Sequence, residues 1–142
     1  MVNNSKSTEN IADGLTEKPI KEDVVTDKKE IICEIEVVTD LIGGKWKPVI
    51  VYLLGFQGKK RFGELKTLMG SISHITLINK LKELEEDGIV FREAFATVPM
   101  RVEYSLTERG MSLMPVLEML CVWGKRNIDY NKYLMINPCV KN

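Results

Sequence analysis

A pair of short helical patterns separated by a tight turn constrains the fold of this 142-residue chain more than any other feature. The apolar residues within 62–69 recur on one helical face, and Gly70 then supplies a helix stop. Ser73 can accept a hydrogen bond from the backbone of the following turn, so it is expected to cap a second helix that runs to Asp87. The inward face of this second helix is expected to consist of Leu77, Leu81 and Leu84. Two helices joined this tightly are typical of a helix-turn-helix, which exposes its second helix.

Two strand patterns follow the second helix. Residues 89–96 are rich in aliphatic and aromatic side chains, and residues 101–106 alternate between apolar and polar positions. The four residues between them are longer than a two-residue turn, so they are expected to project as a loop. We therefore expect an α+β, mostly α fold, a winged helix-turn-helix domain with a two-stranded antiparallel wing. A helix exposed in this way fits the major groove of DNA, which is about 12 Å wide.

Helical patterns also flank this unit. Residues 31–42 form one that ends at a pair of glycines, and residues 46–56 form another, in which Pro48 is tolerated because it falls in the first turn. After the strands, Thr107 can cap a last helix that Pro115 is expected to kink.

The apolar surface of the last helix is wider than one wall of a small domain needs, which favours a homodimer built on this C-terminal helix. The residues of this helix expected at the dimer interface are Val116, Leu117, Leu120 and Trp123. In the alternative interpretation, the extra apolar width packs against the first helix of the same chain.

Composition indicates one domain with polar ends. Residues 1–30 are expected to form a disordered N-terminal tail, residues 31–131 the winged helix-turn-helix domain, and residues 132–142 a C-terminal tail. The chain lacks a basic and apolar signal segment and any apolar run long enough to cross a bilayer, so a cytoplasmic protein without a membrane partner is expected. Three widely spaced cysteines and one histidine predict neither a disulfide framework nor a metal site.

Charge is distributed unevenly although the net charge is zero. Residues 1–42 carry 5 Lys or Arg and 10 Asp or Glu, residues 43–82 carry 8 and 1, and residues 83–142 carry 7 and 9. The three segments therefore have net charges of −5, +7 and −2. Because phosphate binding depends on local cationic density, the basic centre favours double-stranded DNA as a partner. A solvated lysine-rich face is the alternative.

The exposed side chains of the helix after Ser73 are suited to reading bases. Asn79 can pair with the two exposed groups of adenine, Thr76 can donate or accept, and Ile75 can pack on a thymine methyl group. His74 is placed better for phosphate, or is a surface histidine with no role. Acidic residues end this helix, so its N-terminus is expected to enter the groove first. The full set of expected DNA contacts is Lys45, Arg61, Ser73, His74, Ile75, Thr76, Asn79, Lys80, Lys82 and Arg101.

Two cations outside that helix have distinct expected roles. Arg61 precedes the first helix of the pair and is a candidate for phosphate. Arg101 in the wing is expected to reach phosphate or the minor groove, or only to pair with an acid such as Glu103.

These residues resemble the HxlR-type winged helix-turn-helix regulators, which are related to the MarR group. The resemblance covers roughly residues 33–131 and includes Cys33, IGGKWK at 42–47, RFGEL at 61–65, LKELEEDG at 81–88, VPMRVEYSLTERG at 98–110 and WG at 123–124. It implies a homodimer with the first and last helices at its interface, which adds Ile35 and Val38 of the first helix to the expected interface residues. It also implies binding to a pseudo-palindromic operator, and it favours repression. It also implies a regulator without cofactor or catalytic chemistry.

The chain departs from the family pattern at two positions. Met100 and Glu34 stand where the family usually has proline. In several members the cysteine equivalent to Cys33 senses oxidants, and the resemblance implies that role here; a small residue packed at the dimer seam is the alternative.

An enzyme and a protein-contact module are the alternative function classes for this sequence. No nucleophile elbow or phosphate-binding glycine loop supports an enzyme. A winged helix used only for protein contact is the other alternative, because a fold does not fix function.

Overall fold

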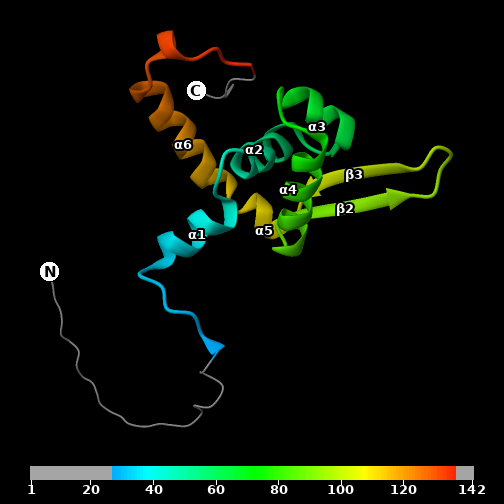
Figure 1. The fold of residues 1–142 in the computed structure, drawn as a ribbon, viewed down its shortest axis with the longest axis horizontal. Coiled ribbons are helices and arrows are strands. Elements are labelled where there is room, and N and C mark those ends of the chain that lie inside the picture. Colours follow the sequence, from blue (N-terminus) through cyan, green and yellow to red (C-terminus); the bar gives the residue numbers. More distant parts are fainter. Residues whose placement is uncertain (1–26, 137–142) are drawn as a thin grey trace, which may run out of the picture. The chain divides into compact units, whose positions relative to one another are not determined.

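The computed structural model describes residues 27–136 and divides the chain into two compact units, residues 1–34 and 35–142. The predicted tail over residues 1–30 therefore lies mostly outside the described residues, as does the end of the predicted C-terminal tail. The helices and strands belong almost entirely to the second unit (Figure 1).

The second unit is mostly helical with one small sheet, which confirms the predicted fold class. Its principal helices are α1 (Glu34–Ile42), α2 (Lys47–Gln57), α3 (Phe62–Leu68) and α4 (His74–Glu86), followed after the strands by α5 (Glu108–Met111) and α6 (Met114–Asn127). A short 3-10 turn, η4 (Tyr130–Lys132), comes last. No helix among residues 27–136 is long and apolar enough to cross a membrane.

The ends of α2 and α4 follow from local chemistry that the sequence already contains. A proline occupies the first turn of α2, where the missing backbone donor has no partner to lose. Ser73 caps α4 by accepting a hydrogen bond from the Thr76 amide at 3.1 Å, as predicted. Gly88 follows α4 with φ of +74°, a conformation that glycine adopts without steric cost.

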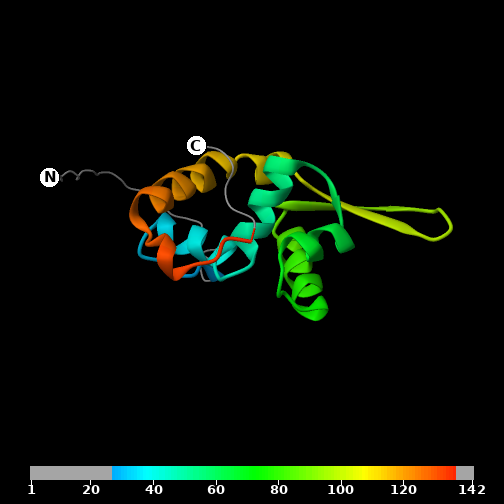
Figure 2. The same ribbon diagram turned by 90° about the horizontal axis from the view of Figure 1, so that it is seen from above.

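The sheet has one strand more than the sequence predicted. The hairpin of β2 (Val90–Phe95) and β3 (Arg101–Leu106) is antiparallel and pairs Val90 with Leu106 at its base and Phe95 with Arg101 near its tip. β1 (Lys60–Arg61) adds to the other side of β3, which gives the order β1-β3-β2. Two residues are too few to show an alternating pattern, so the sequence could not reveal β1. Figures 1 and 2 show the hairpin projecting from the helices.

The single kinked C-terminal helix was a wrong prediction. Thr107 does act as a cap, but of the short α5, where its hydroxyl oxygen accepts from the Gly110 amide at 2.9 Å. A new helix, α6, then begins, and Pro115 lies in its first turn. Proline there starts a helix instead of kinking one, because the first-turn amides have no intrahelical acceptor.

The hydrophobic core lies between the helix-turn-helix and the base of the hairpin. Leu77, Leu81 and Leu84 of α4 are at most 1% exposed, which confirms the predicted inward face. Leu65 of α3 and Ile50 of α2 are fully buried in the same cluster. This packing fixes α4 by one face and leaves the opposite face outside the core.

Candidate nucleic-acid interface

The N-terminus of α4 presents a fixed arrangement of hydroxyl groups. Ser73 Oγ accepts from the Thr76 amide and donates to Thr76 Oγ1 at 2.8 Å. The Ser73 hydroxyl therefore both donates and accepts a hydrogen bond within the cap. The Thr76 hydroxyl still has its own proton, which it can donate to a group outside the protein. The free amides of this first turn favour an anion at the same place.

Beyond the cap, the predicted contact residues occupy the outer side of α4. Ile75 is 69% exposed, and Asn79 and Lys82 are exposed as well. An exposed isoleucine next to exposed polar groups suits a surface that meets both base methyls and base edges. Lys80 differs, because it is half-buried with its ammonium 3.5 Å from Glu83 Oε1, so its charge is partly neutralised within the helix.

His74 links α4 to α3. Its ring lies 4.6 Å from the ring of Phe62, centroid to centroid, in a tilted arrangement, while the residue stays exposed. The histidine therefore packs at the crossing of the two helices and still faces the solvent beside the cap.

An ion pair between a buried lysine and a partly exposed glutamate holds α4 against α2, and the sequence did not reveal it. Lys47 at the start of α2 is 9% exposed, and its Nζ lies 2.8 Å from Glu83 Oε1. The hydrogen bond from Lys47 lowers the pKa of Glu83, with a further contribution from Lys80. Lys47 is one of the cations of the basic centre, but it pairs with Glu83 within the protein and is not available to DNA. The one sign of its burial in the sequence is its position at the start of an apolar helix.

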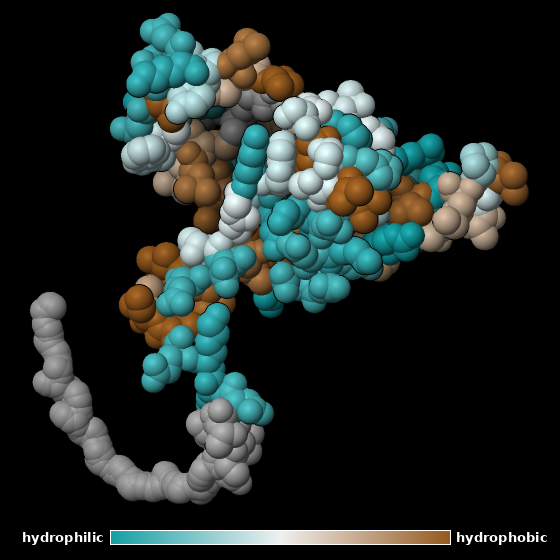
Figure 3. Space-filling model, in the orientation of Figure 1, coloured by the Kyte–Doolittle hydropathy of each residue, from teal (hydrophilic) through white to brown (hydrophobic). Residues whose placement is uncertain are grey.

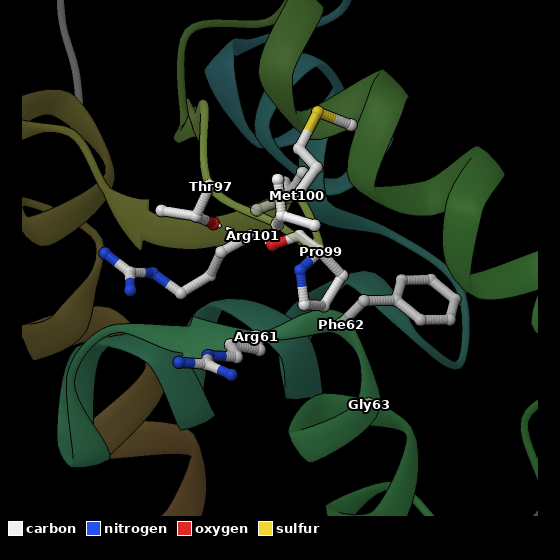
Figure 4. Close-up of a pocket in the computed structure, with 9 residues that line it drawn as sticks. Arg61, Phe62, Gly63, Thr97, Pro99, Met100 and Arg101 are labelled. Carbon is white, nitrogen blue, oxygen red and sulfur yellow. Dashed lines mark hydrogen bonds between the residues drawn. The ribbon is translucent and has the colours of Figure 1, made fainter.

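A cleft of about 480 Å³ separates the start of α3 from the wing loop. It is lined by residues 61–63 and 97–102, and Figure 4 shows the Arg61 and Arg101 side chains extending toward the same side. Arg61 is exposed, and its amide donates to Glu64 Oε1 at 2.8 Å, which anchors its backbone. Two guanidinium groups on one side form a surface that suits phosphate oxygens.

Arg101 is held by two neighbours. Its Nε lies 3.1 Å from Glu103 Oε2, and its guanidinium carbon lies 4.2 Å from the centre of the Phe95 ring. The pairing with Glu103, the alternative raised from the sequence, is therefore present. The Arg101 side chain remains 34% exposed, so part of the guanidinium still faces outward.

Two other lysines of the basic segment contact neighbouring side chains, so fewer free positive charges are available than the sequence suggests. Lys59 Nζ lies 3.7 Å from Glu103 Oε1 and is partly neutralised there. Lys45 is exposed, with its ammonium 4.5 Å from the centre of the Trp46 ring. The net charge of +7 for residues 43–82 therefore overstates the positive charge available to DNA, and the exposed Arg61 and Lys82 supply a large part of what remains.

A second feature is an uncovered apolar face on α1 and α6, defined by Ile35, Val38, Val116, Leu120 and Trp123. These side chains are 70%, 37%, 47%, 58% and 64% exposed, respectively. Within the part of the chain that the structure describes, these side chains stay exposed, so packing between α1 and α6 leaves this face open. Figure 3 shows apolar surface over α1 and α6, and Figures 1 and 2 place α6 opposite the wing. Leu117, expected at the same interface, is instead 3% exposed and belongs to the core, because it points toward α2.

The cysteines occupy different environments. Cys33 is an exposed free thiol immediately before α1. Cys121 is disulfide-bonded, which the wide spacing of the cysteines in the sequence did not reveal. No cluster of three or more metal-ligating side chains occurs within residues 27–136.

Comparison with known proteins gives a consistent result. The family model described as HxlR-like helix-turn-helix matches residues 41–132. An uncharacterised HTH-type transcriptional regulator from Halalkalibacterium halodurans is 54% identical over 87 residues, which cover 61% of this chain and 77% of that protein. The uncharacterised HTH-type regulator YybR from Bacillus subtilis is 44% identical over 110 residues, which cover 78% of this chain and 87% of that protein. The solved structure of the redox regulator HypR in its oxidised form is similar with a TM-score of 0.65 and 46% identity, covering 68% of this chain and 99% of that one.

Proposed function

Because the chain belongs to the HxlR-like helix-turn-helix family and is a helix-turn-helix transcriptional regulator, we propose that it binds a pseudo-palindromic DNA operator as a homodimer and represses transcription. The observation that carries the proposal is the N-terminus of α4, where a capped helix start stands beside exposed Ile75 and Asn79, on a helix whose opposite face is buried through Leu77, Leu81 and Leu84. Family membership supports a regulatory protein instead of an enzyme.

In the proposed complex, α4 enters the major groove with its capped end first. Asn79 and Thr76 meet base edges, Ile75 meets a thymine methyl, and the backbone amides of the first turn meet phosphate. Arg61 contacts the phosphate backbone beside the groove. Arg101 reaches phosphate or the minor groove from the wing, with its approach set by Glu103 and Phe95.

Two copies are needed to read two half-sites. The apolar face of α1 and α6 supplies the proposed dimer contact, since burying it removes several large exposed side chains from water at once. The two α4 helices of such a dimer are expected one helical turn of DNA apart, about 34 Å.

The DNA proposal is tested with operators selected from a random duplex library. We expect Asn79→Ala to lose about 1 to 3 kcal/mol of binding free energy at one base position, and Arg61→Ala to weaken all sequences alike and reduce the salt dependence. Lys132→Ala, on the η4 turn, is the matched charge control. Equal, sequence-independent losses for Asn79→Ala and Arg61→Ala would contradict the groove assignment. No duplex binding even at low salt would instead favour a protein-contact module.

The dimer is tested by sedimentation. Trp123→Glu places a charge on the proposed interface and is expected to give monomers, whereas Val98→Glu, at a fully exposed position of the wing loop, should leave the dimer intact. A Trp123→Glu protein that remains dimeric would exclude this face as the interface. Repression is tested by transcription in vitro from a promoter that contains the selected operator, where added protein should lower the transcript yield.

A thiol response at Cys33 is a second proposed property of the same regulator. The residue is an exposed free thiol at the start of α1, and the similar structure of HypR is described as a redox regulator in its oxidised form. Alkylation with iodoacetamide, which bonds the Cys33 sulfur to an acetamide group and releases iodide, is expected to lower operator affinity in the wild type and to leave Cys33→Ser unaffected. Unchanged affinity after complete modification of Cys33 would exclude this role.

A further inference from the structure

A small apolar cavity, open to the surface at Val49 and Leu120, lies between α2 and α6. It has a volume of about 180 Å³ and is lined by Pro48, Val49, Tyr52, Leu53, Leu117, Leu120 and Cys121. Most of these side chains are hydrocarbon. An apolar cavity of about 150 Å³ is large enough to hold one benzene ring, so this one can hold a ring with a small substituent.

One polar group interrupts this lining. The Tyr52 hydroxyl oxygen is buried and has no hydrogen-bond partner in the structure of residues 27–136. Leaving such a group without a partner is costly, and nearly all buried polar groups in proteins have one. The ring of Tyr52 stacks on Phe56 with centroids 5.7 Å apart and planes within 10°, which limits the movement that would bring the hydroxyl to another acceptor.

The charge near this hydroxyl restricts the ligand further. Burial and the nearby Glu118 carboxylate raise the pKa of Tyr52, so the hydroxyl stays protonated at neutral pH and can donate. The same carboxylate disfavours a second negative charge in the cavity. A neutral acceptor therefore suits the site better than an anionic one.

We propose that the cavity between α2 and α6 binds a small neutral single-ring molecule whose carbonyl or ether oxygen accepts a hydrogen bond from the Tyr52 hydroxyl. Such a ligand is an effector candidate, because α2 also carries Lys47, which neighbours the cavity-lining Pro48 and bonds Glu83 on α4. A ligand seated against Pro48 and Val49 thus touches the helix that positions α4. Ligand binding requires no DNA contact, although Leu120 lines the cavity and also belongs to the apolar face of α1 and α6.

The test uses three ring compounds of similar size and the full-length protein. Binding of para-fluoroacetophenone, para-fluoroethylbenzene and para-fluorobenzoate is followed by fluorine NMR, with backbone amide shifts to locate the site. We expect the neutral ketone to saturate with a Kd of about 1 mM or tighter and to shift amides of α2 and α6. The ethyl compound, which lacks the acceptor, and the anionic benzoate should each bind more weakly.

Variants distinguish the contribution of the Tyr52 hydroxyl to ligand affinity from that of the cavity itself. Tyr52→Phe removes only the oxygen and should weaken the ketone by about 3- to 10-fold, without changing the affinity for the ethyl compound. Val49→Phe fills the cavity and should abolish binding of both. Tyr133→Phe makes the same chemical change at an exposed position outside the cavity and should change neither. Tyr52→Phe is also expected to raise the unfolding midpoint, since it deletes a buried hydroxyl without a partner.

Several results would overturn the inference. The first is the absence of saturable ketone binding, which would also result if a second copy of the chain covered the cavity. The second is a ketone affinity that Tyr52→Phe and Val49→Phe leave unchanged. The third is tighter binding of the benzoate than of the ketone. Operator binding measured in parallel keeps the two proposals apart. A protein that binds operator but no ketone contradicts only this inference, and one that binds ketone but no operator contradicts only the DNA proposal.

Discussion

Glu83→Gln tests whether the ion pair with Lys47 stabilises the position of α4. The substitution keeps the shape of the side chain and removes the charge that faces the Lys47 ammonium at 2.8 Å. The Lys47 side chain is only 11% exposed, so its charge would remain in the fold without its closest counter-charge.

The expected size of the effect follows from burial. Exposed ion pairs contribute about 0 to 1 kcal/mol, whereas removing one partner of a fully buried pair costs about 3 to 5 kcal/mol. Lys47 is buried but the Glu83 side chain is 43% exposed, so water reaches one half of the pair. We expect Glu83→Gln to lower the free energy of unfolding by about 2 kcal/mol, between these limits.

Lys47→Met provides the complementary variant. It removes the buried charge and keeps the aliphatic bulk, so the free energy of unfolding should stay within about 0.5 kcal/mol of the wild type. The double variant should behave like Lys47→Met alone, because Glu83→Gln is costly only while the ammonium is present. Glu85→Gln, on the same helix at an exposed position, is the control and should have little effect.

Urea unfolding at several pH values supplies the measurement. The pKa of Glu83 is lowered in the folded protein, so its contribution is fully present above the ordinary value of 4.5 and is lost as the pH falls through the folded value. The difference between wild type and Glu83→Gln should therefore shrink in acid. Equal small effects of all single variants, with no coupling between Lys47 and Glu83, would refute the reasoning.

Two further predictions concern the local structure around α4 and α5. Ser73→Ala removes the acceptor for the Thr76 amide and should lower the free energy of unfolding by about 1 kcal/mol. Ser71→Ala, in the preceding turn, is the control and should leave the free energy of unfolding unchanged. Equal urea midpoints for the two variants would argue against the cap. Gly110→Ala should cost about 1 to 3 kcal/mol, because an added Cβ would lie 2.2 Å from the Ile89 carbonyl oxygen. Gly63→Ala, whose added Cβ meets no atom within 4 Å apart from its chain neighbours and its own helix backbone, is the thermal-unfolding control. Similar losses for both glycine variants would contradict the contact.

Much of the candidate interface was predictable because its signals are local. Ser73 capping α4, the glycine after its last turn and the spacing of the inward leucines each depend on residues within a few positions of one another. Hydrogen bonds between a side chain and the next turn form wherever the chain becomes helical, so the sequence carries them almost completely.

Predictions that depended on distant contacts were less successful. The pattern of α6 identifies an apolar helix but not which residues face the core, so it predicts Leu117 at the dimer interface, whereas Leu117 is buried. Pro115 predicts a kink, but the helix ends before it and a new helix, α6, starts with it in the first turn. The two residues of β1 carry no pattern of their own and become a strand only because β3 lies beside them.

The sequence by itself determined the helix-turn-helix, its cap and the hairpin, since propensity, capping and hydrophobic period act over one or two turns of chain. Only the tertiary structure decided which charged side chains remain exposed to solvent. Lys47 and Arg61 look alike as basic residues of the same segment, yet folding buries the first against Glu83, 36 positions along the chain, and leaves the second exposed. The free energy of a charge depends on its solvation and on its neighbours in space, and both arise from contacts between segments that the order of residues does not reveal.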